Sequence, residues 1–372
     1  MQSERNTSSG QWSVVSGQSK SAAAASRVSD LHPSSFILPP FPRRFQRPAF
    51  TLTELLVVIA IIAVLAAMVS VGVMNALATA KQTRIKTEVD QLDTAFKAYR
   101  EKYGSFPPAT FTGAAISSHI ARAFPRYDAT TYLGSDLALA GFAPPIRFRP
   151  DQALVFWLQG FSPDPTQPFI TPDGFQIIHV GTASQKGPKV TVTPLFDFDK
   201  SRLAAVGVGA TLPSYFPQGT KADATGAPYL YWDSQSLPMA GPGGPLPPFP
   251  LNPMMWNVLF PPTMPAVLFP NAGGIRPYAL DANGNGRLSD PADPTKLDPG
   301  DGWVNPDSFQ IISAGMDGKY GSLAAARTDP ARIYPTGTST DLTSAASYDV
   351  AGGDDDNVTN FSAKARLGDS KP

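Results

Sequence analysis

Cysteine is absent from this chain of 372 residues, so disulfide bonds and thiolate metal sites are excluded. Histidine occurs only three times, as His32, His119 and His179, and this scatter argues against a histidine-rich zinc site. A domain without disulfides must instead be stabilised by its core or by a metal with oxygen ligands.

Neither sign of charge predominates, because thirty basic residues balance thirty acidic ones. There is consequently no overall basic field that would favour nucleic acid as a partner. Proline and glycine, 39 and 31 residues, exceed typical usage but stay below the roughly 25–30% that marks low-complexity disorder. With 42% hydrophobic residues, the composition predicts a folded protein with many loops.

Residues 1–49 are rich first in Ser and Ala and then in Pro, without apolar periodicity. We expect this stretch to be a disordered leader that is removed, and it is left out of the fold prediction. Its length keeps a different start codon open as an alternative.

A run without charge follows the leader. Leu55–Val73 has no charged residue, and a helix of about 20 apolar residues crosses a hydrocarbon core of ~30 Å. The sequence therefore predicts a transmembrane segment at residues 55–73. Glu54 stands at its edge, where an ionisable group usually has a partner and a function. Arg43, Arg44 and Arg47 lie just before the span and mildly favour a cytoplasmic amino terminus.

A second pattern continues this segment as an amphipathic helix. Apolar residues recur at intervals of four and three, which is one face of a helix. Gly104 and then Pro107-Pro108 end it, so residues 50–109 are predicted to hold one helix of about 80 Å. The apolar positions are Ile85, Val89, Leu92, Phe96, Tyr99 and Tyr103.

Residues 110–372 are expected to form a β domain with many loops, in which residues 110–300 are an insertion. Phe175–Ile178 and Pro228–Trp232 read as strands, and Ala153–Leu158 as either a strand or a buried helix. Residues 238–270 contain 11 Pro and are predicted to be an extended loop, with a contact surface as the alternative.

Residues Asp281–Asp290 fit the first part of a calcium loop, because oxygen ligands occur at every second position. The fit fails at position 12, which is Ala292, and two Asn-Gly pairs also suit a plain turn, which we favour. The candidate ligands are Asp281, Asn283, Asn285, Arg287 through its carbonyl, and Ser289.

Basic residues, a short motif and an apolar helix follow one another here, and the motif is Ala49-Phe50-Thr51-Leu52-Thr53-Glu54. This arrangement resembles the class III signal of type IV pilins and type II secretion pseudopilins. In that family a membrane peptidase cuts before the Phe and methylates the new amino terminus. The resemblance implies cleavage between Ala49 and Phe50, N-methylation of Phe50, and an assembly role for Glu54 as the fifth mature residue. The family usually has Gly where this chain has Ala49.

The resemblance also implies a pilin-like α+β fold, in which a long N-terminal helix packs on an antiparallel β-sheet domain. It implies a single pass through the cell inner membrane, with the C-terminal domain in the periplasm. The implied partners are other pseudopilin subunits in homo- and hetero-filaments, prepilin peptidase, the inner-membrane assembly platform and membrane lipid.

A second resemblance lies near the end of the chain. Ser313–Gly318, which contains Gly-Met-Asp-Gly, and Asp354–Phe361 are similar to the C-terminal region of the major pseudopilin, which binds calcium. This resemblance implies Asp317 as a ligand, Asp356 or Asp355 as the second carboxylate, and the Ala314 carbonyl. A solvated acidic tail after a β-turn is the alternative.

These observations together predict a structural subunit, a pseudopilin of type II secretion, and not an enzyme. The sequence contains no nucleophile elbow, phosphate loop or dinucleotide fingerprint. The Gly-Met-Asp-Gly turn and the absence of Cys favour a pseudopilin over a type IV pilus subunit. The remaining alternative is an exported calcium-binding or hydrolytic protein with an ordinary secretory signal.

Overall fold

The computed structural model describes residues 51–109, 113–142, 149–206, 212–223, 225–234, 277–284, 300–320, 332–334 and 353–370. The predicted leader 1–49 and the proline-rich stretch 238–270 lie outside these ranges. The chain divides into two units, Met1–Ile62 and Ala63–Pro372. In the first unit the described residues are the start of one helix, and the second unit contains all other described elements.

Helix α1 runs from Leu52 to Tyr103, which confirms the predicted long helix. Within the described residues it is the one helix long and apolar enough to cross a membrane. It ends at Gly104, whose φ of +84° suits glycine and whose N–H donates to the Arg100 carbonyl at 2.7 Å. The expected stop signal and the observed helix end therefore agree.

The apolar stripe in the second half of α1 is buried, as predicted. Phe96 stacks on Tyr231 with ring centroids 4.0 Å apart and also contacts Phe309 at 5.2 Å. Tyr103, at the end of the stripe, is half-buried. The members that are 1% exposed or less are Ile85, Val89, Leu92, Phe96 and Tyr99.

Three shorter helices follow α1, namely α2 (Gly113–Ala123), α3 (Ala129–Leu139) and α4 (Pro150–Leu158). Asp128 caps α3 by accepting hydrogen bonds from the backbone N–H groups of Thr130 and Thr131. The sequence left Ala153–Leu158 open between strand and helix, and it is the buried helix α4, which begins with a proline.

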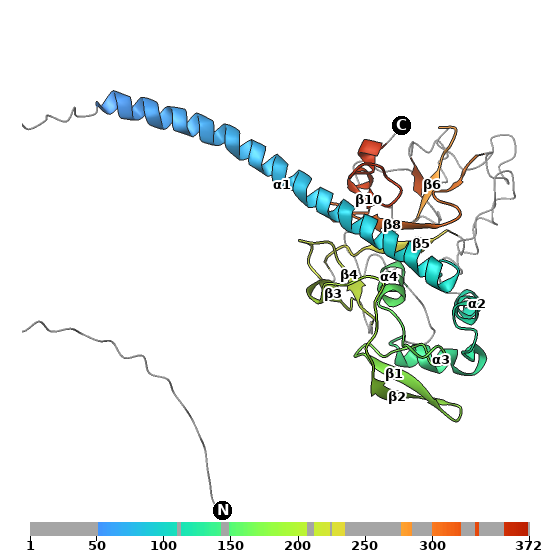
Figure 1. Cartoon of the computed structure of the whole chain (residues 1–372). Helices are drawn as coiled ribbons and strands as arrows, with labels where there is room; N and C mark the ends of the chain where they lie inside the picture. The colour runs from blue at the N-terminus through green and yellow to red at the C-terminus, as the bar shows by residue number, and fades with distance from the viewer. Residues whose placement is uncertain are drawn as a thin grey trace, which may run out of the picture. The chain divides into compact units, whose positions relative to one another are not determined.

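A three-stranded antiparallel sheet, in the order β10-β8-β5, lies against the second half of α1 (Figure 1). Its strands are β5 (Leu230–Asp233), β8 (Phe309–Ser313) and β10 (Val358–Thr359). Side chains alternate across it, so Tyr231 and Ile311 join the core under α1 and α4. Trp232 and Ile312 point into a second core.

The second core is shared with the sheet β7-β6-β9, formed by β7 (Gly302–Trp303), β6 (Tyr278–Leu280) and β9 (Arg332–Tyr334). Strands β6 and β9 pair in parallel, which differs from the purely antiparallel domain that we predicted. A parallel pair needs a longer connection than a hairpin, and the distance along the chain between β6 and β9 permits this pairing. The α+β class with a long helix on an antiparallel sheet is confirmed.

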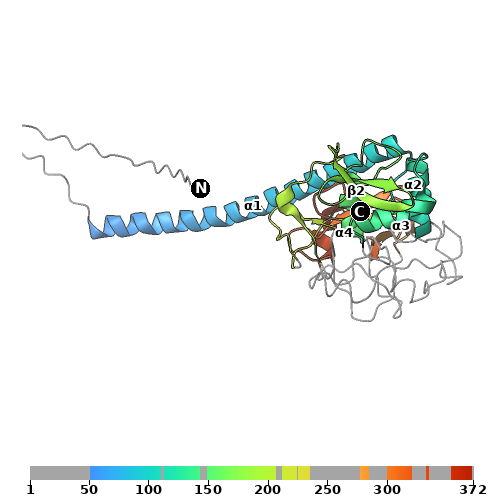
Figure 2. The ribbon, with the colours of Figure 1, turned by 90° about the horizontal axis from the view of Figure 1, so that it is seen from below.

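Two small sheets are the remaining β structure in the part of the chain that the structure describes. The hairpin of β1 (Phe175–Val180) and β2 (Ala183–Lys189) lies beside α3, and Figure 2 shows it from below. Strands β3 (Leu203–Ala204) and β4 (Ser214–Tyr215) form the second pair. Short 3-10 turns lie at η1 (Lys200–Arg202), η2 (Asp354–Asp356) and η3 (Gly368–Ser370).

A polar contact fastens α1 to this domain as well. Glu88 accepts hydrogen bonds from Arg202 at 2.5 Å, from the Tyr215 hydroxyl at 2.8 Å and from the Tyr229 hydroxyl at 2.6 Å. Because the carboxylate has three donors, its partial burial leaves no uncompensated charge. The helix is thus held by both apolar packing and a charge-assisted cluster.

Candidate functional site

Glu54 takes part in a capping box at the first turn of α1. Its carboxylate accepts hydrogen bonds from the Thr51 N–H and the Thr51 hydroxyl, both at 2.9 Å. In return the Glu54 N–H donates to the Thr51 hydroxyl at 3.2 Å. The sequence analysis missed this local role, although Thr-x-x-Glu before an apolar run is the usual signature. Ala49 and Phe50, the predicted processing residues, lie outside the described residues.

The span predicted at Leu55–Val73 is apolar, and no described part of the chain packs on it. None of the most apolar stretch of α1 is buried in the protein. Its large side chains range from 46% exposed at Val58 to 69% at Met68. Such a continuous apolar surface needs lipid or another apolar surface. This helix fits a single-pass membrane anchor.

The predicted calcium residues of the second resemblance come together around the turn that follows β8. Asp356 Oδ2 accepts hydrogen bonds from the backbone N–H groups of Met316 and Asp317, the latter at 2.9 Å. Its Oδ1 accepts one from Gln82 of α1 at 3.0 Å and lies 3.4 Å from the Arg366 guanidinium. The turn after β8 and the segment that contains Asp356 are therefore in contact, although they are about 40 residues apart in the chain.

Glycines allow this close approach. Gly315 has a φ of +63°, and a Cβ there would lie 1.9 Å from the Asp356 carbonyl oxygen. Gly353 has a φ of +108°, and a Cβ there would lie 2.6 Å from Asp317 Oδ2. Both positions need glycine for backbone conformation and for space.

The hollow beside this turn has a volume of about 440 Å³ and an acidic lining. Partial burial raises the pKa of the Asp317 carboxyl group, and the negative charge of Asp356 adds to this shift. Among the described lining residues Arg366 is the basic one, and Asp317, Asp355 and Asp356 are the acidic ones. Ala314, the predicted carbonyl ligand, is buried next to the turn. The lining carries more negative than positive charge.

The weaker calcium loop is described only in part. Asp281 is buried and accepts a hydrogen bond from the Gly284 N–H at 2.8 Å, whereas Asn283 is exposed. Asn285, Arg287 and Ser289 lie outside the described residues. Asp301, which the sequence analysis missed, is buried nearby and accepts from the Ala282 N–H at 2.8 Å. Within the described ranges, no three His, Cys, Asp or Glu residues form a metal cluster.

The two described histidines lie in separate polar clusters. His119 hydrogen-bonds the Tyr99 hydroxyl at 2.9 Å and the Ser105 hydroxyl at 3.2 Å. Burial, with the charge of Arg122 adding, lowers the pKa of His119 to about 4. His179 instead contacts Asp136 at 3.0 Å.

The comparisons with known proteins concern the N-terminal segment. Residues 45–70 match the family model of the prokaryotic N-terminal methylation motif. The searches of curated proteins and of solved structures found no match. The chain thus carries a signal of the type IV pilin or pseudopilin type, in the segment that contains Thr51 and Glu54.

Proposed function

We propose that this chain is a structural subunit of a type II secretion pseudopilus, made as a precursor and assembled through α1. The observation that carries the proposal is the match of residues 45–70 to the methylation motif. The match includes the start of an apolar helix whose second half is packed on an α+β domain. That combination suits a subunit that is anchored first and assembled later.

Processing is the first step. Prepilin peptidase cuts between Ala49 and Phe50 and methylates the new amino group of Phe50. Glu54 then becomes the fifth residue of the mature chain. Ala49 is small, which suits the position before the cut.

Assembly follows through the apolar part of α1. The capping box holds Glu54 at the first turn, where Oε2 takes both Thr51 donors. Oε1 makes no hydrogen bond to any residue that the structure describes, so it can accept from the amino terminus of an adjacent subunit. A charge among packed apolar helices is costly without a partner, and this pairing supplies one. The uncovered apolar surfaces of neighbouring helices then bury one another or contact lipid.

The turn at Gly315–Gly318 and the lack of Cys support a pseudopilin over a pilus subunit. In this proposal the chain crosses the inner membrane once, and its C-terminal domain lies in the periplasm. It assembles with other pseudopilin subunits and with the inner-membrane assembly platform. In this proposal its role is structural.

Calcium is part of the same proposal. The acidic lining around Asp317 suits a hard cation that prefers oxygen ligands. Asp317 would be its principal carboxylate ligand, and Asp355 or Asp356 and the Ala314 carbonyl would supply further oxygen ligands. Asp356 already accepts backbone N–H groups, so its main part would be to hold the turn. When bound, the cation would neutralise the facing carboxylates and link the turn to η2.

Mass spectrometry of the mature amino terminus tests the function. We expect a chain that begins with N-methylated Phe50. A mature chain that begins near Thr79, after Ala76-Leu77-Ala78, would overturn the proposal in favour of an ordinary secretory signal. Deletion of the gene separates the two filament types, because loss of secreted protein with intact pili supports the pseudopilus, and the reverse supports a pilus.

A further inference from the structure

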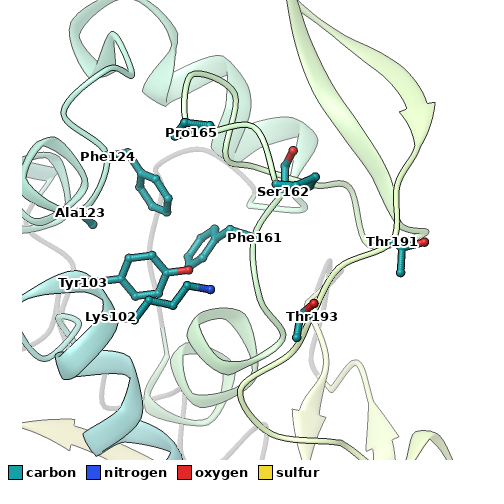
Figure 3. A pocket seen from close by; sticks show the side chains of 10 residues that line it. Lys102, Tyr103, Ala123, Phe124, Phe161, Ser162, Pro165, Thr191 and Thr193 are labelled. Carbon is teal, nitrogen blue, oxygen red and sulfur yellow. The ribbon is translucent and has the colours of Figure 1, made fainter.

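A hollow of about 380 Å³ lies beside the C-terminal end of α1 (Figure 3). Its volume is within the range of about 300–1,000 Å³ that is common for ligand sites. Tyr103, Phe124 and Phe161 gather on one side of it, and Thr191 and Thr193 lie on the other. At about 30 Å³ for each water molecule, the hollow holds about a dozen waters, which matches the size of a small organic ligand.

The aromatic side of the hollow is a contiguous surface. The rings of Phe124 and Phe161 are 5.0 Å apart, and Tyr103 lies 5.4 Å from the first and 5.7 Å from the second. Since each ring is supported by the other two, their orientations are set by packing. A further aromatic ring can join such a group in an edge-to-face or offset arrangement.

The opposite wall is fixed to the end of α4. Gly160 follows that helix with a φ of +90°, and a Cβ there would lie 2.6 Å from Val192 Cγ1 and 2.7 Å from the Thr193 carbonyl oxygen. The Leu195 N–H, two residues further on, donates to the Leu158 carbonyl at 2.9 Å. Because packing and hydrogen bonds hold both walls, the hollow is formed before any ligand binds, as is usual for ligand sites.

Two hydrogen-bond donors border the aromatic surface. Lys102 Nζ lies 5.2 Å from the centre of the Tyr103 ring, a cation–π contact that keeps the amine beside the hollow. Burial raises the pKa of the Tyr103 hydroxyl to about 12, so the group stays a donor at neutral pH. Neither the Lys102 amine nor the Tyr103 hydroxyl has a hydrogen-bond partner in the described part of the chain. Among the described lining residues Lys102 is the charged one, so the matching ligand group is an acceptor with one negative charge.

The end of α1 does not oppose an anion at this place. A helix C-terminus carries roughly half a negative charge. The last turn of α1 has two basic residues, Arg100 and Lys102, and one acid, Glu101, so its side chains add one net positive charge. Asp164 is not among the described lining residues, and its carboxylate accepts from the Thr166 N–H at 2.9 Å and from the Thr166 hydroxyl at 2.7 Å. Positive charge therefore predominates at this end of the hollow.

We propose that the hollow beside Tyr103 binds a small aromatic monocarboxylate. The ring of the ligand packs against Tyr103, Phe124 and Phe161. Its carboxylate accepts hydrogen bonds from the Lys102 amine and the Tyr103 hydroxyl. A neutral aromatic compound would leave the amine without a counter-charge, and an aliphatic acid would lack the edge-to-face contacts with the rings. The proposal does not depend on filament assembly.

Fluorine NMR measures the dissociation constant of fluorophenylpropionate for the full chain in detergent. Fluorophenylpropanamide keeps the ring and removes the charge, whereas fluorohexanoate keeps the charge and removes the ring. Lys102→Met removes the amine, and Lys221→Met, at an exposed lysine that is not among the described lining residues, is the matched control. Ligand that partitions into detergent is the same for every variant, so a difference between variants reports the site.

We expect Lys102→Met to raise the dissociation constant of the acid by about tenfold or more, which corresponds to one lost charge-assisted hydrogen bond, and to leave the amide unaffected. Tyr103→Phe, which keeps the ring, should raise it by about threefold, and Lys221→Met should match the wild type. Circular dichroism verifies that each variant is folded.

Three results would each overturn the proposal. The first is a wild-type chain that shifts the acid signal no more than detergent alone does. The second is an equal dissociation constant of the acid for Lys102→Met and the wild type. The third is binding of the amide or of fluorohexanoate as tight as that of fluorophenylpropionate, because the site would then recognise either the charge or the ring alone.

Discussion

Gln82 of α1 donates a hydrogen bond of 3.0 Å to Asp356, 274 residues later in the chain. The same carboxylate accepts the backbone N–H groups of Met316 and Asp317. One side chain therefore joins the long helix, the turn after β8 and the C-terminal segment. The stability of this junction should depend on Asp356 more than on any other acid near it.

Asp356→Ala should lower the free energy of unfolding by about 2–4 kcal/mol, because it leaves several donors without an acceptor. Chemical denaturation of the full chain in detergent measures this change. Asp369→Ala is the matched control, since Asp369 is exposed in the neighbouring η3 turn, and it should alter stability by less than about 0.5 kcal/mol. Equal effects of the two substitutions would contradict the role given to Asp356.

His119 should make stability depend on pH between about 4 and 6.5. Its pKa is about 4 in the fold and ~6.5 in an unfolded chain, so the unfolded state binds more protons in this window. The contribution is fully present above pH ~6.5 and is lost as the pH falls through 4. It amounts to roughly 3 kcal/mol.

His119→Gln removes this titration while keeping a group that can hydrogen-bond Tyr99. We therefore expect the variant to lose less stability than the wild type between pH 6.5 and 4, measured by denaturation at a series of pH values. The comparison isolates His119, because every other titratable group is the same in the two proteins. Parallel curves for the two proteins would show that His119 is not the titrating group.

Glu54→Ala should leave membrane insertion intact but reduce filament yield at least tenfold. The apolar span loses no apolar residue, whereas the charged amino terminus of the neighbouring subunit loses its partner. Membrane fractionation and electron microscopy measure the two effects separately. Glu101→Ala, an exposed acid at the other end of α1, serves as the control and should assemble normally. Normal filament yield from the Glu54 variant would refute the assembly role.

Calcium should raise the melting temperature of the wild-type chain and have little effect on Asp317→Asn. Ligand at 100 times its dissociation constant stabilises a fold by about 2.7 kcal/mol, which gives a measurable shift. Asp197→Asn, at an exposed acid outside the turn, should keep the full response. A wild-type protein whose melting is the same in calcium and in chelator would exclude this site.

Much of the fold was predictable because its signals are local. The four-three spacing from Ile85 to Tyr99 fixes which face of α1 is buried, and it depends only on helix geometry. Ala153–Leu158 could not be assigned, because a short apolar run suits a buried helix as well as a strand. The parallel pairing of β9 with β6 depends on contacts between distant segments, which periodicity does not report.

The candidate sites also include some features that a local pattern predicts and others that depend on contacts between distant segments. The Thr-x-x-Glu spacing is enough to predict the capping box of Thr51 and Glu54. The sequence analysis assigned Glu54 only an assembly role. The position of Asp301 beside Asp281 follows from the pairing of β6 with β7, and no local pattern predicts it. Asp199 likewise caps the η1 turn by accepting a hydrogen bond from the Ser201 N–H.

The C-terminal segment that packs on α1 also affects the order in which the protein folds. Lys86 bonds the Thr359 carbonyl at 3.0 Å and Asp93 accepts a hydrogen bond from Asn360, so residues made late complete the surface of the helix made first. During translation the last contacts of this helix can form only after nearly the whole domain has been synthesised. Proteolytic surveillance could therefore distinguish finished subunits from interrupted ones by whether this part of the helix is covered.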